Sequence, residues 1–161
     1  MFVTESDDEP FDHDPLDDGS DPSSVAPLVI APPAAGKPQP RNIDDALPQT
    51  GRLLLVGCMR PADAVHALRW SGALNHESDP GRLGAVLRSW EERFGAYVVR
   101  IGLDTLTLGV ERPPSAAEAP AVAREHHAFC PDNIDQSSCD GDVDAYAAAI
   151  AGHPRWDFWW D

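Results

Sequence analysis

The chain has 161 residues and a formal net charge of −15, with 27 acidic against 12 basic side chains. This length is typical of one domain. So acidic a chain lacks the cluster of lysine and arginine that nucleic-acid binding requires, and we expect no direct nucleic-acid partner. No stretch approaches the roughly 20 apolar residues that cross a bilayer, so we expect no membrane association either.

The N-terminus and the cysteines both indicate a cytoplasmic protein. The first ten residues contain neither a basic start nor an apolar run, so they do not resemble a secretory signal. The three cysteines, Cys58, Cys130 and Cys139, are an odd number in a chain without an export signal. We therefore expect reduced thiols rather than disulfides.

Residues 1–50 form a region of distinct composition. They contain 11 acidic and 2 basic side chains and nine of the 16 prolines. Because such a segment repels itself and buries little apolar surface, it predicts a disordered acidic and Pro/Ala-rich arm. A single folded domain is expected over residues 51–161, which carry 16 acidic and 10 basic side chains.

The folded composition begins with the apolar run Leu53–Val56, which predicts a strand covered on both faces. A short helix is expected from Pro61 to about residues 70–72, because proline is favoured at the first helical position. The strongest helix prediction covers Pro80–Phe94, which has an aspartate before it as an N-cap and a glycine just beyond its end.

Two strands with alternating apolar residues follow, and a turn near residues 103–104 predicts that they form an antiparallel hairpin. The first strand is expected to point Tyr97, Val99 and Ile101 to one side. The second strand is expected to share one face among three residues: Leu106, Leu108 and Val110.

The last third of the chain predicts two more helices and a strand. Ser115 and Glu118 have the spacing of a capping box for a third helix, whose start Pro120 should delay or kink. A fourth helix is predicted over about residues 142–151, and alternating aromatic rings over residues 156–160 predict a last strand. Together these elements predict an α+β fold, with an antiparallel sheet of about three to four strands packed against about four helices.

Several ordered motifs carry a family resemblance. They are WSGALN at residues 70–75, LRSWEERFG at 87–95, LDTL at 103–106, EH at 125–126, FCPDN at 129–133 and WDFWWD at 156–161. In this order they resemble a bacterial domain family of unknown function that occurs in many actinobacteria and whose members end in the same aromatic tail. The resemblance covers about residues 52–161 and indicates no mechanism.

The densest set of reactive side chains is His126, Cys130, Asp132 and Asn133. A helix would place His126 and Cys130 on neighbouring turns, and a thiol beside an imidazole can form an activated nucleophile. The competing interpretation is structural, because His126 shares an apolar stripe with its helical neighbours and a small buried cysteine packs well. We favour the core interpretation and keep a catalytic or ligand-binding site as the alternative.

Four candidate metal donors fall within fourteen residues of one another: His126, His127, Cys130 and Cys139. Zinc favours nitrogen and sulfur ligands, but structural zinc sites usually have paired, closely spaced ligands, and this spacing is irregular. We therefore predict no metal and no cofactor, and keep a metal-stabilised domain as a third hypothesis.

The aromatic residues suggest a second candidate surface. Five tryptophans in a small domain should supply most of its core, but Trp159 is out of phase with its neighbours and is predicted to be exposed. Trp159 is thus a candidate binding residue on the surface. Asn75 and Trp90 are candidate neighbours of a ligand site at residues 126–133.

Phosphate-binding loops and nucleophile elbows are missing from the sequence. We therefore predict a non-enzymatic cytoplasmic interaction or regulatory module that meets another protein through its acidic arm or its aromatic surface. The alternative is an uncharacterised enzyme or small-molecule binder that uses residues 126–133.

Overall fold

The computed structural model describes residues 51–161, and the predicted acidic arm over residues 1–50 lies outside them. The elements follow in the order η2 (Pro61–Asp63), α1 (Ala64–Ala67), α2 (Pro80–Phe94), β1 (Ala96–Ile101), β2 (Thr105–Val110), α3 (Ala119–Phe129), α4 (Asp132–Asp135), α5 (Val143–Ile150) and β3 (Arg155–Trp159). The expected α+β class is confirmed, with three strands in one antiparallel sheet. None of the helices over residues 51–161 is both long and apolar enough to cross a bilayer.

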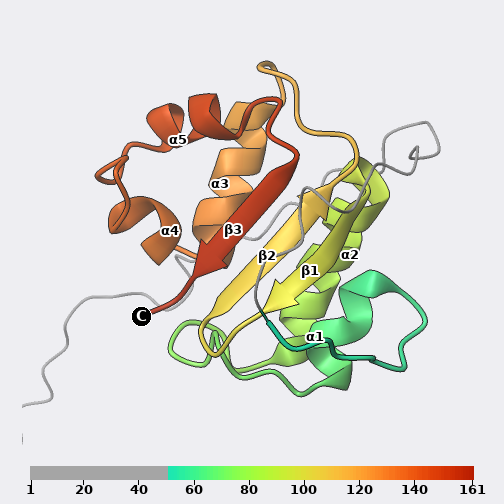
Figure 1. Ribbon diagram of the computed structural model, residues 1–161. Helices are drawn as coiled ribbons and strands as arrows, with labels where there is room; N and C mark the ends of the chain where they lie inside the picture. Colours follow the sequence, from blue (N-terminus) through green and yellow to red (C-terminus); the bar gives the residue numbers. More distant parts are fainter. Residues whose placement is uncertain (1–50) are drawn as a thin grey trace, which may run out of the picture.

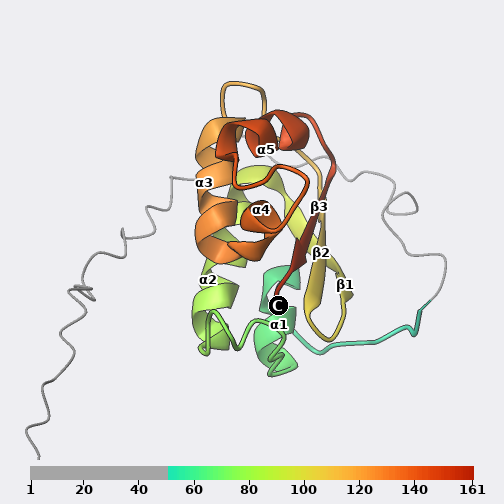
Figure 2. The same cartoon turned by 90° about the vertical axis from the view of Figure 1, so that its left-hand side faces the viewer.

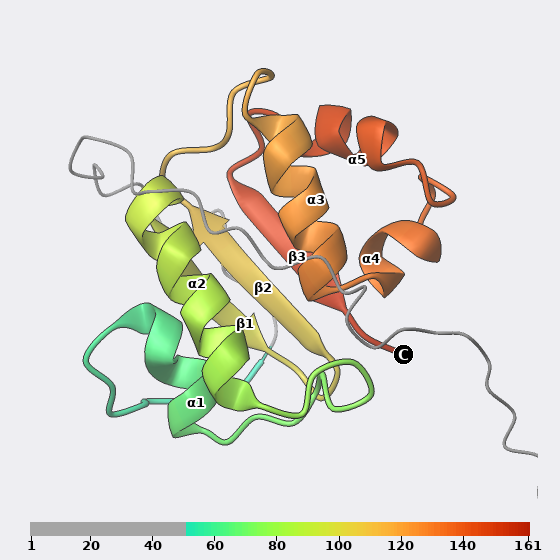
Figure 3. The ribbon, with the colours of Figure 1, turned by 180° about the vertical axis from the view of Figure 1, so that it is seen from behind.

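The helices and the sheet form two layers. The strand order is β1-β2-β3, and Figure 1 shows the three strands in front of helices α2 and α3. Seen from behind, α2 and α3 lie over the sheet, while α4 and α5 lie beside α3 (Figure 3). One face of the sheet is therefore covered, and no helix or strand from residues 51–161 lies over the other face (Figure 2).

Helix α2 has the predicted bounds, and its ends show why. The Asp79 carboxylate accepts a hydrogen bond from the backbone N–H of Gly81 at 2.8 Å, which satisfies one of the free donors at the start of the helix. At the other end, Gly95 takes a left-handed conformation with φ 61° and returns its N–H to the last turn. Glycine adopts this conformation without steric cost, so the helix ends there.

The predicted strand at Leu53–Val56 is wrong. These residues belong to no strand, and the leucines among them are largely exposed. Burial of an apolar run is favourable in any conformation, but a strand also needs a neighbouring strand with which to form backbone hydrogen bonds. The short helix at Pro61 is confirmed at its start but ends at Ala67, before the predicted residues 70–72, because Arg69 has a positive φ of 49° that turns the chain.

The predicted hairpin is confirmed, but the expected facing of its first strand is wrong. Val98 pairs with Leu108, whereas the next pair is Arg100 with Thr107, so Val99 is the extra residue of a β-bulge. A bulge shifts the alternation by one residue. The residues of β1 that share a face with the buried side chains of β2 are therefore Ala96, Val98 and Ile101.

The predicted features of the last third are confirmed, with one addition. Ser115 donates to the Glu118 carboxylate from both its N–H and its hydroxyl, and the helix starts only at Ala119, as the proline predicted. Asp142 caps α5 by accepting from two backbone N–H groups. The additional element is α4, a single turn that begins after Pro131.

The core is aromatic, and Trp90 lies at its centre with no exposed surface. Three rings lie 4.9–5.5 Å from its ring centroid: Phe129, Trp156 and Phe158. Trp70 and Trp160 form a second pair with centroids 5.3 Å apart. Four of the five tryptophans are buried in the core, and the predicted exposure of Trp159 is confirmed at 37%.

Candidate functional site

His126 is buried inside the aromatic core, on the side of α3 that faces the sheet. Its imidazole packs edge-on against three rings with centroid distances of 4.5–4.9 Å: Trp90, Trp156 and Phe158. Burial, reinforced by the positive charge of Arg93, lowers the pKa of His126 from 6.5 to about 3. The imidazole is therefore neutral at physiological pH, and its Nδ1 lies 3.0 Å from the hydroxyl of Tyr146.

Cys130 ends α3 and is also buried. Its thiol donates a hydrogen bond to the backbone carbonyl of Trp159 at 2.8 Å. Burial raises the pKa of the Cys130 thiol to about 12, so the thiolate is negligible near neutral pH. Because the thiolate is the nucleophilic form, this geometry does not support nucleophilic catalysis by Cys130.

Asp132 and Asn133 use their side chains to hold the end of the chain. The Asn133 amide donates to the backbone carbonyl of Asp157 at 2.8 Å. One oxygen of the Asp132 carboxylate accepts from the N–H of Asp161 at 3.0 Å. The contacts of Cys130, Asp132 and Asn133 therefore fasten the end of α3 and the start of α4 to β3 and the residues after it.

Tyr146 is the functional neighbour that the sequence reasoning did not single out. Its hydroxyl accepts from the Asn133 amide at 3.1 Å and lies within hydrogen-bonding distance of His126. Burial raises the pKa of Tyr146 to about 12, so the hydroxyl keeps its proton and can donate it to the imidazole. The available signal was a tyrosine on the apolar face of α5, because a buried phenol hydroxyl needs a partner.

A buried ion pair joins α2 to α3 beside this cluster. Arg93 donates to the Glu125 carboxylate at 2.7 Å, and the indole N–H of Trp90 donates to the same oxygen at 2.8 Å. Trp90 is therefore a core residue that bridges two helices. Asn75, the other candidate neighbour, donates to the backbone carbonyl of Asp161 at 2.8 Å, and the N–H of Asp161 donates to Asp132, so Asn75 and Asp132 contact the same residue at the end of the chain.

The four metal donors considered from the sequence have separate surroundings. His126 and Cys130 are buried, whereas the His127 imidazole lies 3.0 Å from the carboxylate of Asp135. Cys139 is partly exposed. Among residues 51–161, no three histidine, cysteine or acidic side chains are arranged to hold a metal ion.

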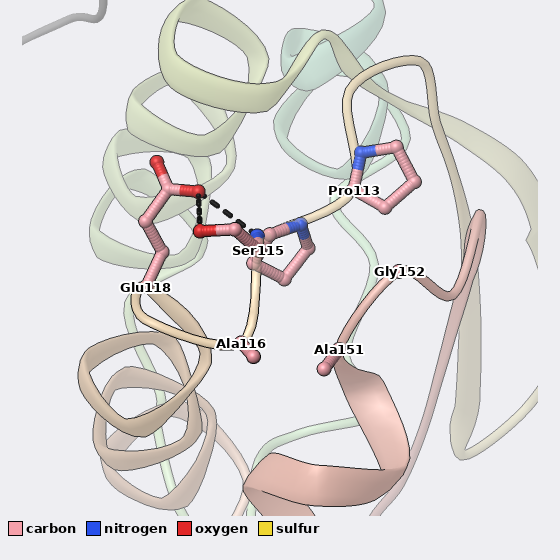
Figure 4. Close-up of a pocket in the computed structure, with 7 residues that line it drawn as sticks. Pro113, Ser115, Ala116, Glu118, Ala151 and Gly152 are labelled. Carbon is pink, nitrogen blue, oxygen red and sulfur yellow. Dashed lines mark hydrogen bonds between the residues drawn. The ribbon is translucent and has the colours of Figure 1, made fainter.

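An open hollow of about 490 Å³ lies at the start of α3, between residues 113–118 and the Ala151–Gly152 turn (Figure 4). The charged side chain in its wall is Glu118, whose carboxylate already accepts two hydrogen bonds from Ser115. His126 lies in the second half of the same helix and Cys130 directly after its end, and neither lines the hollow. The hollow is therefore separate from the candidate residues His126 and Cys130.

The uncovered side of the sheet, which we call the open face, carries a different set of residues. The strand register places them in rows across the sheet: Tyr97 with Gly109 and Arg155, Arg100 with Thr107 and Asp157, and Thr105 with Trp159. The two arginines and the two aromatic residues are the large side chains among them. Trp159, the surface candidate from the sequence, therefore lies on this face opposite Thr105, in the last of these rows.

Contacts within the open face hold several of its side chains in place. Arg155 donates two hydrogen bonds to one carboxylate oxygen of Asp157, at 2.8 and 3.1 Å, and the Thr107 hydroxyl donates to the same oxygen at 2.8 Å. The ring of Tyr97 lies so close over Gly109 that a Cβ at position 109 would overlap it. These side chains are therefore held in place by contacts within the domain itself.

Comparison with known proteins identifies the family of this domain. Neither the curated proteins nor the solved structures include a match to the chain. A family described as Domain of unknown function (DUF4253) matches residues 52–161. This range is most of the chain and includes every helix and strand of the fold. The chain therefore belongs to this family.

Proposed function

We propose that the domain is a non-enzymatic interaction module that binds a protein partner through the open face of its sheet. The observation that carries the proposal is the residue content of this face, whose large side chains are Tyr97, Arg100, Arg155 and Trp159. Tryptophan, tyrosine and arginine contribute most of the binding free energy in protein interfaces. Lysine, which interfaces disfavour, does not occur in residues 51–161.

The rigidity of the open face supports the same proposal. Association loses free energy for each side chain that must be ordered on binding. Here Arg155 is already held by Asp157, and the ring of Tyr97 already lies against Gly109. The strands beneath them are fixed by the aromatic core on the opposite side, so a partner would meet a preformed surface.

The charge of the open face indicates the chemistry of the partner. Arg155 is paired with Asp157, whereas Arg100 is exposed and forms no ion pair with any of residues 51–161. A partner that places a carboxylate opposite Arg100 would complete a charge-assisted hydrogen bond. The proposed partner is therefore a protein with an acidic group set among apolar residues that cover Trp159.

The alternative, an enzyme or small-molecule binder at residues 126–133, has less support. A nucleophile and its base need an accessible pocket and a reactive protonation state. The thiol of Cys130 and the imidazole of His126 are buried and held neutral, and the side chains of Asp132 and Asn133 are used to bind backbone groups.

The test compares the partners captured by three forms of the full chain after cross-linking in cells, with quantitative mass spectrometry. The first is the wild type, the second carries Trp159→Ala with Arg100→Ala, and the third carries Arg124→Ala, an exposed arginine on α3 away from the open face. Recovery of one protein should fall about tenfold or more in the double variant, because a hot-spot residue contributes about 2 kcal/mol. The control should recover it normally, and equal recovery by all three forms would reject the open face as a binding surface.

A further inference from the structure

The two edges of the sheet differ in whether they can accept another strand. At the β3 edge, Asn133 and Cys130 donate side-chain hydrogen bonds to the backbone carbonyls of Asp157 and Trp159. These contacts occupy acceptors that an added strand would need. Helix α4 also packs against β3, so this edge is closed.

At the other edge, η2 packs against β1, but this contact includes no backbone pairing. Among residues 51–161, no backbone or side-chain group forms a hydrogen bond to the outward-facing backbone groups of Ala96–Ile101. Val98 and Ile101 face the core from this edge and remain half-exposed, whereas β2 is buried along most of its length. A strand placed beside β1 would therefore receive hydrogen bonds and cover apolar surface that the domain leaves partly open.

An extended apolar segment is available to fill such an edge. Leu53, Leu54 and Leu55 are 103%, 62% and 97% exposed, so most of their apolar surface is uncovered. Residues 51–59 make no backbone hydrogen bond with the rest of the described chain. Figure 2 shows this blue-green segment running outward on the strand side of the domain before it enters α1.

We propose that residues 53–56 of one copy add as a fourth strand to β1 of a second copy, and that the exchange is reciprocal. Residues 53–59 (LLLVGCM) carry no charge, so they can enter an apolar edge despite the negative charge of the chain. The helix η2 that follows them already packs against β1 and α2 of its own chain, and the segment leaves the domain there instead of folding back. A two-fold exchange closes both open edges at once, so it ends at a dimer.

This dimer uses the edge of the sheet and does not depend on the partner proposed for the open face. The full chain is examined by sedimentation velocity over a wide range of concentrations, at moderate salt so that charge repulsion is screened. We expect a concentration-dependent species with twice the chain mass of 17.4 kDa. A single species of monomer mass at every concentration would overturn the proposal.

Two variants locate the contact. The double variant Leu53→Asp, Leu55→Asp should be monomeric at every concentration, with the melting temperature that the wild type shows at high dilution, because both side chains are exposed in the single chain. The matched control Leu103→Asp changes a leucine that is 90% exposed in the hairpin turn and should still dimerise. A dimer that persists in the double variant would show that another surface forms it and would overturn the strand exchange.

Hydrogen–deuterium exchange distinguishes a second copy from the segment's own chain. In the wild type, protection of the β1 amide groups should rise with protein concentration, and it should not rise in the double aspartate variant. Protection of β1 that depends on Leu53 and Leu55 but not on concentration would mean that the segment covers its own sheet, which would overturn the dimer.

Discussion

The thiol of Cys130 donates a hydrogen bond to the backbone carbonyl of Trp159 across 2.8 Å, and this contact joins the end of α3 to the outer edge of β3. Asn133 makes the matching contact to Asp157, two residues earlier on the same strand. The FCPDN segment and the aromatic tail are therefore bound to each other by these side-chain hydrogen bonds. Cys130 and Asn133, which looked reactive in the sequence, have this structural role.

The burial of Cys130 leads to a prediction about the reactivity of its thiol. With its pKa raised to about 12, Cys130 is ionised to only about one part in ten thousand at pH 8, whereas Cys58 is exposed. A disulfide reagent at pH 8 should therefore modify Cys58 rapidly and Cys130 only when the protein unfolds. Peptide mass spectrometry after timed labelling identifies the modified residue, and rapid labelling of Cys130 in the folded protein would contradict its burial.

His126 predicts a loss of stability in acid. Its pKa is about 3 in the folded protein and near 6.5 in the unfolded chain, so the unfolded chain binds the extra proton more readily between these values. Stability from the neutral imidazole is complete above pH 6.5 and is lost as the pH falls towards 3. At pH 4.5 the loss should be about 2–3 kcal/mol.

Urea unfolding of the wild type and of His126→Gln, at pH 7 and pH 4.5, measures this contribution. The variant is expected to be less stable at pH 7, because a packed ring is lost. Its stability should nevertheless fall less between the two pH values than that of the wild type, since the carboxylates titrate in both. An equal fall in the two proteins would mean that His126 is protonated in the folded state.

The sequence predicted most of the fold because its signals there are local. An N-cap, a left-handed glycine and an apolar face define α2 within its own residues, and the alternating rings at residues 156–160 define β3 in the same way. The failures depend on contacts that are distant in the chain. Leu53–Val56 lacks a neighbouring strand, and the bulge at Val99 shifts the facing of β1 without any proline or glycine to mark it.

In the candidate site too, the local features were predictable from the sequence and the long-range contacts were not. The sequence correctly placed His126 on the apolar stripe of α3 and favoured a buried Cys130, but it could not show what their polar atoms bind. Their partners are Tyr146 and the carbonyl of Trp159, which lie 20 and 29 residues away. The open face could not be predicted either, because it requires knowing which side of the sheet the helices cover.

The buried ion pair between Arg93 and Glu125 predicts a large cost for removing one partner. The two side chains are 7% and 12% exposed, and Glu125 also accepts the indole N–H of Trp90. Glu125→Ala leaves the buried guanidinium uncompensated, so we expect a loss of about 3–5 kcal/mol in the free energy of unfolding. Urea titration at pH 7 measures it.

A double replacement provides the control for this ion pair. Arg93→Met with Glu125→Leu removes both charges and keeps apolar volume at the two positions, so it should be less destabilised than Glu125→Ala alone. If Glu125→Ala were within about 1 kcal/mol of the wild type, the side chain of Arg93 would have to reach solvent in the variant, and the pair would not be a fixed part of the core.

The contact between Tyr97 and Gly109 predicts a coupling between two positions on the open face. A Cβ at position 109 would overlap the tyrosine ring, so Gly109→Ala should displace the ring and destabilise the domain by about 1–3 kcal/mol. In the Tyr97→Ala background the obstacle is gone, and the same change should be neutral or stabilising by up to about 1 kcal/mol, because alanine restricts the unfolded chain. A double-mutant cycle in urea measures the coupling. If the destabilisations caused by Gly109→Ala and Tyr97→Ala simply added, the tyrosine ring would not contact Gly109. Tyr97 would then not be a fixed part of the open face.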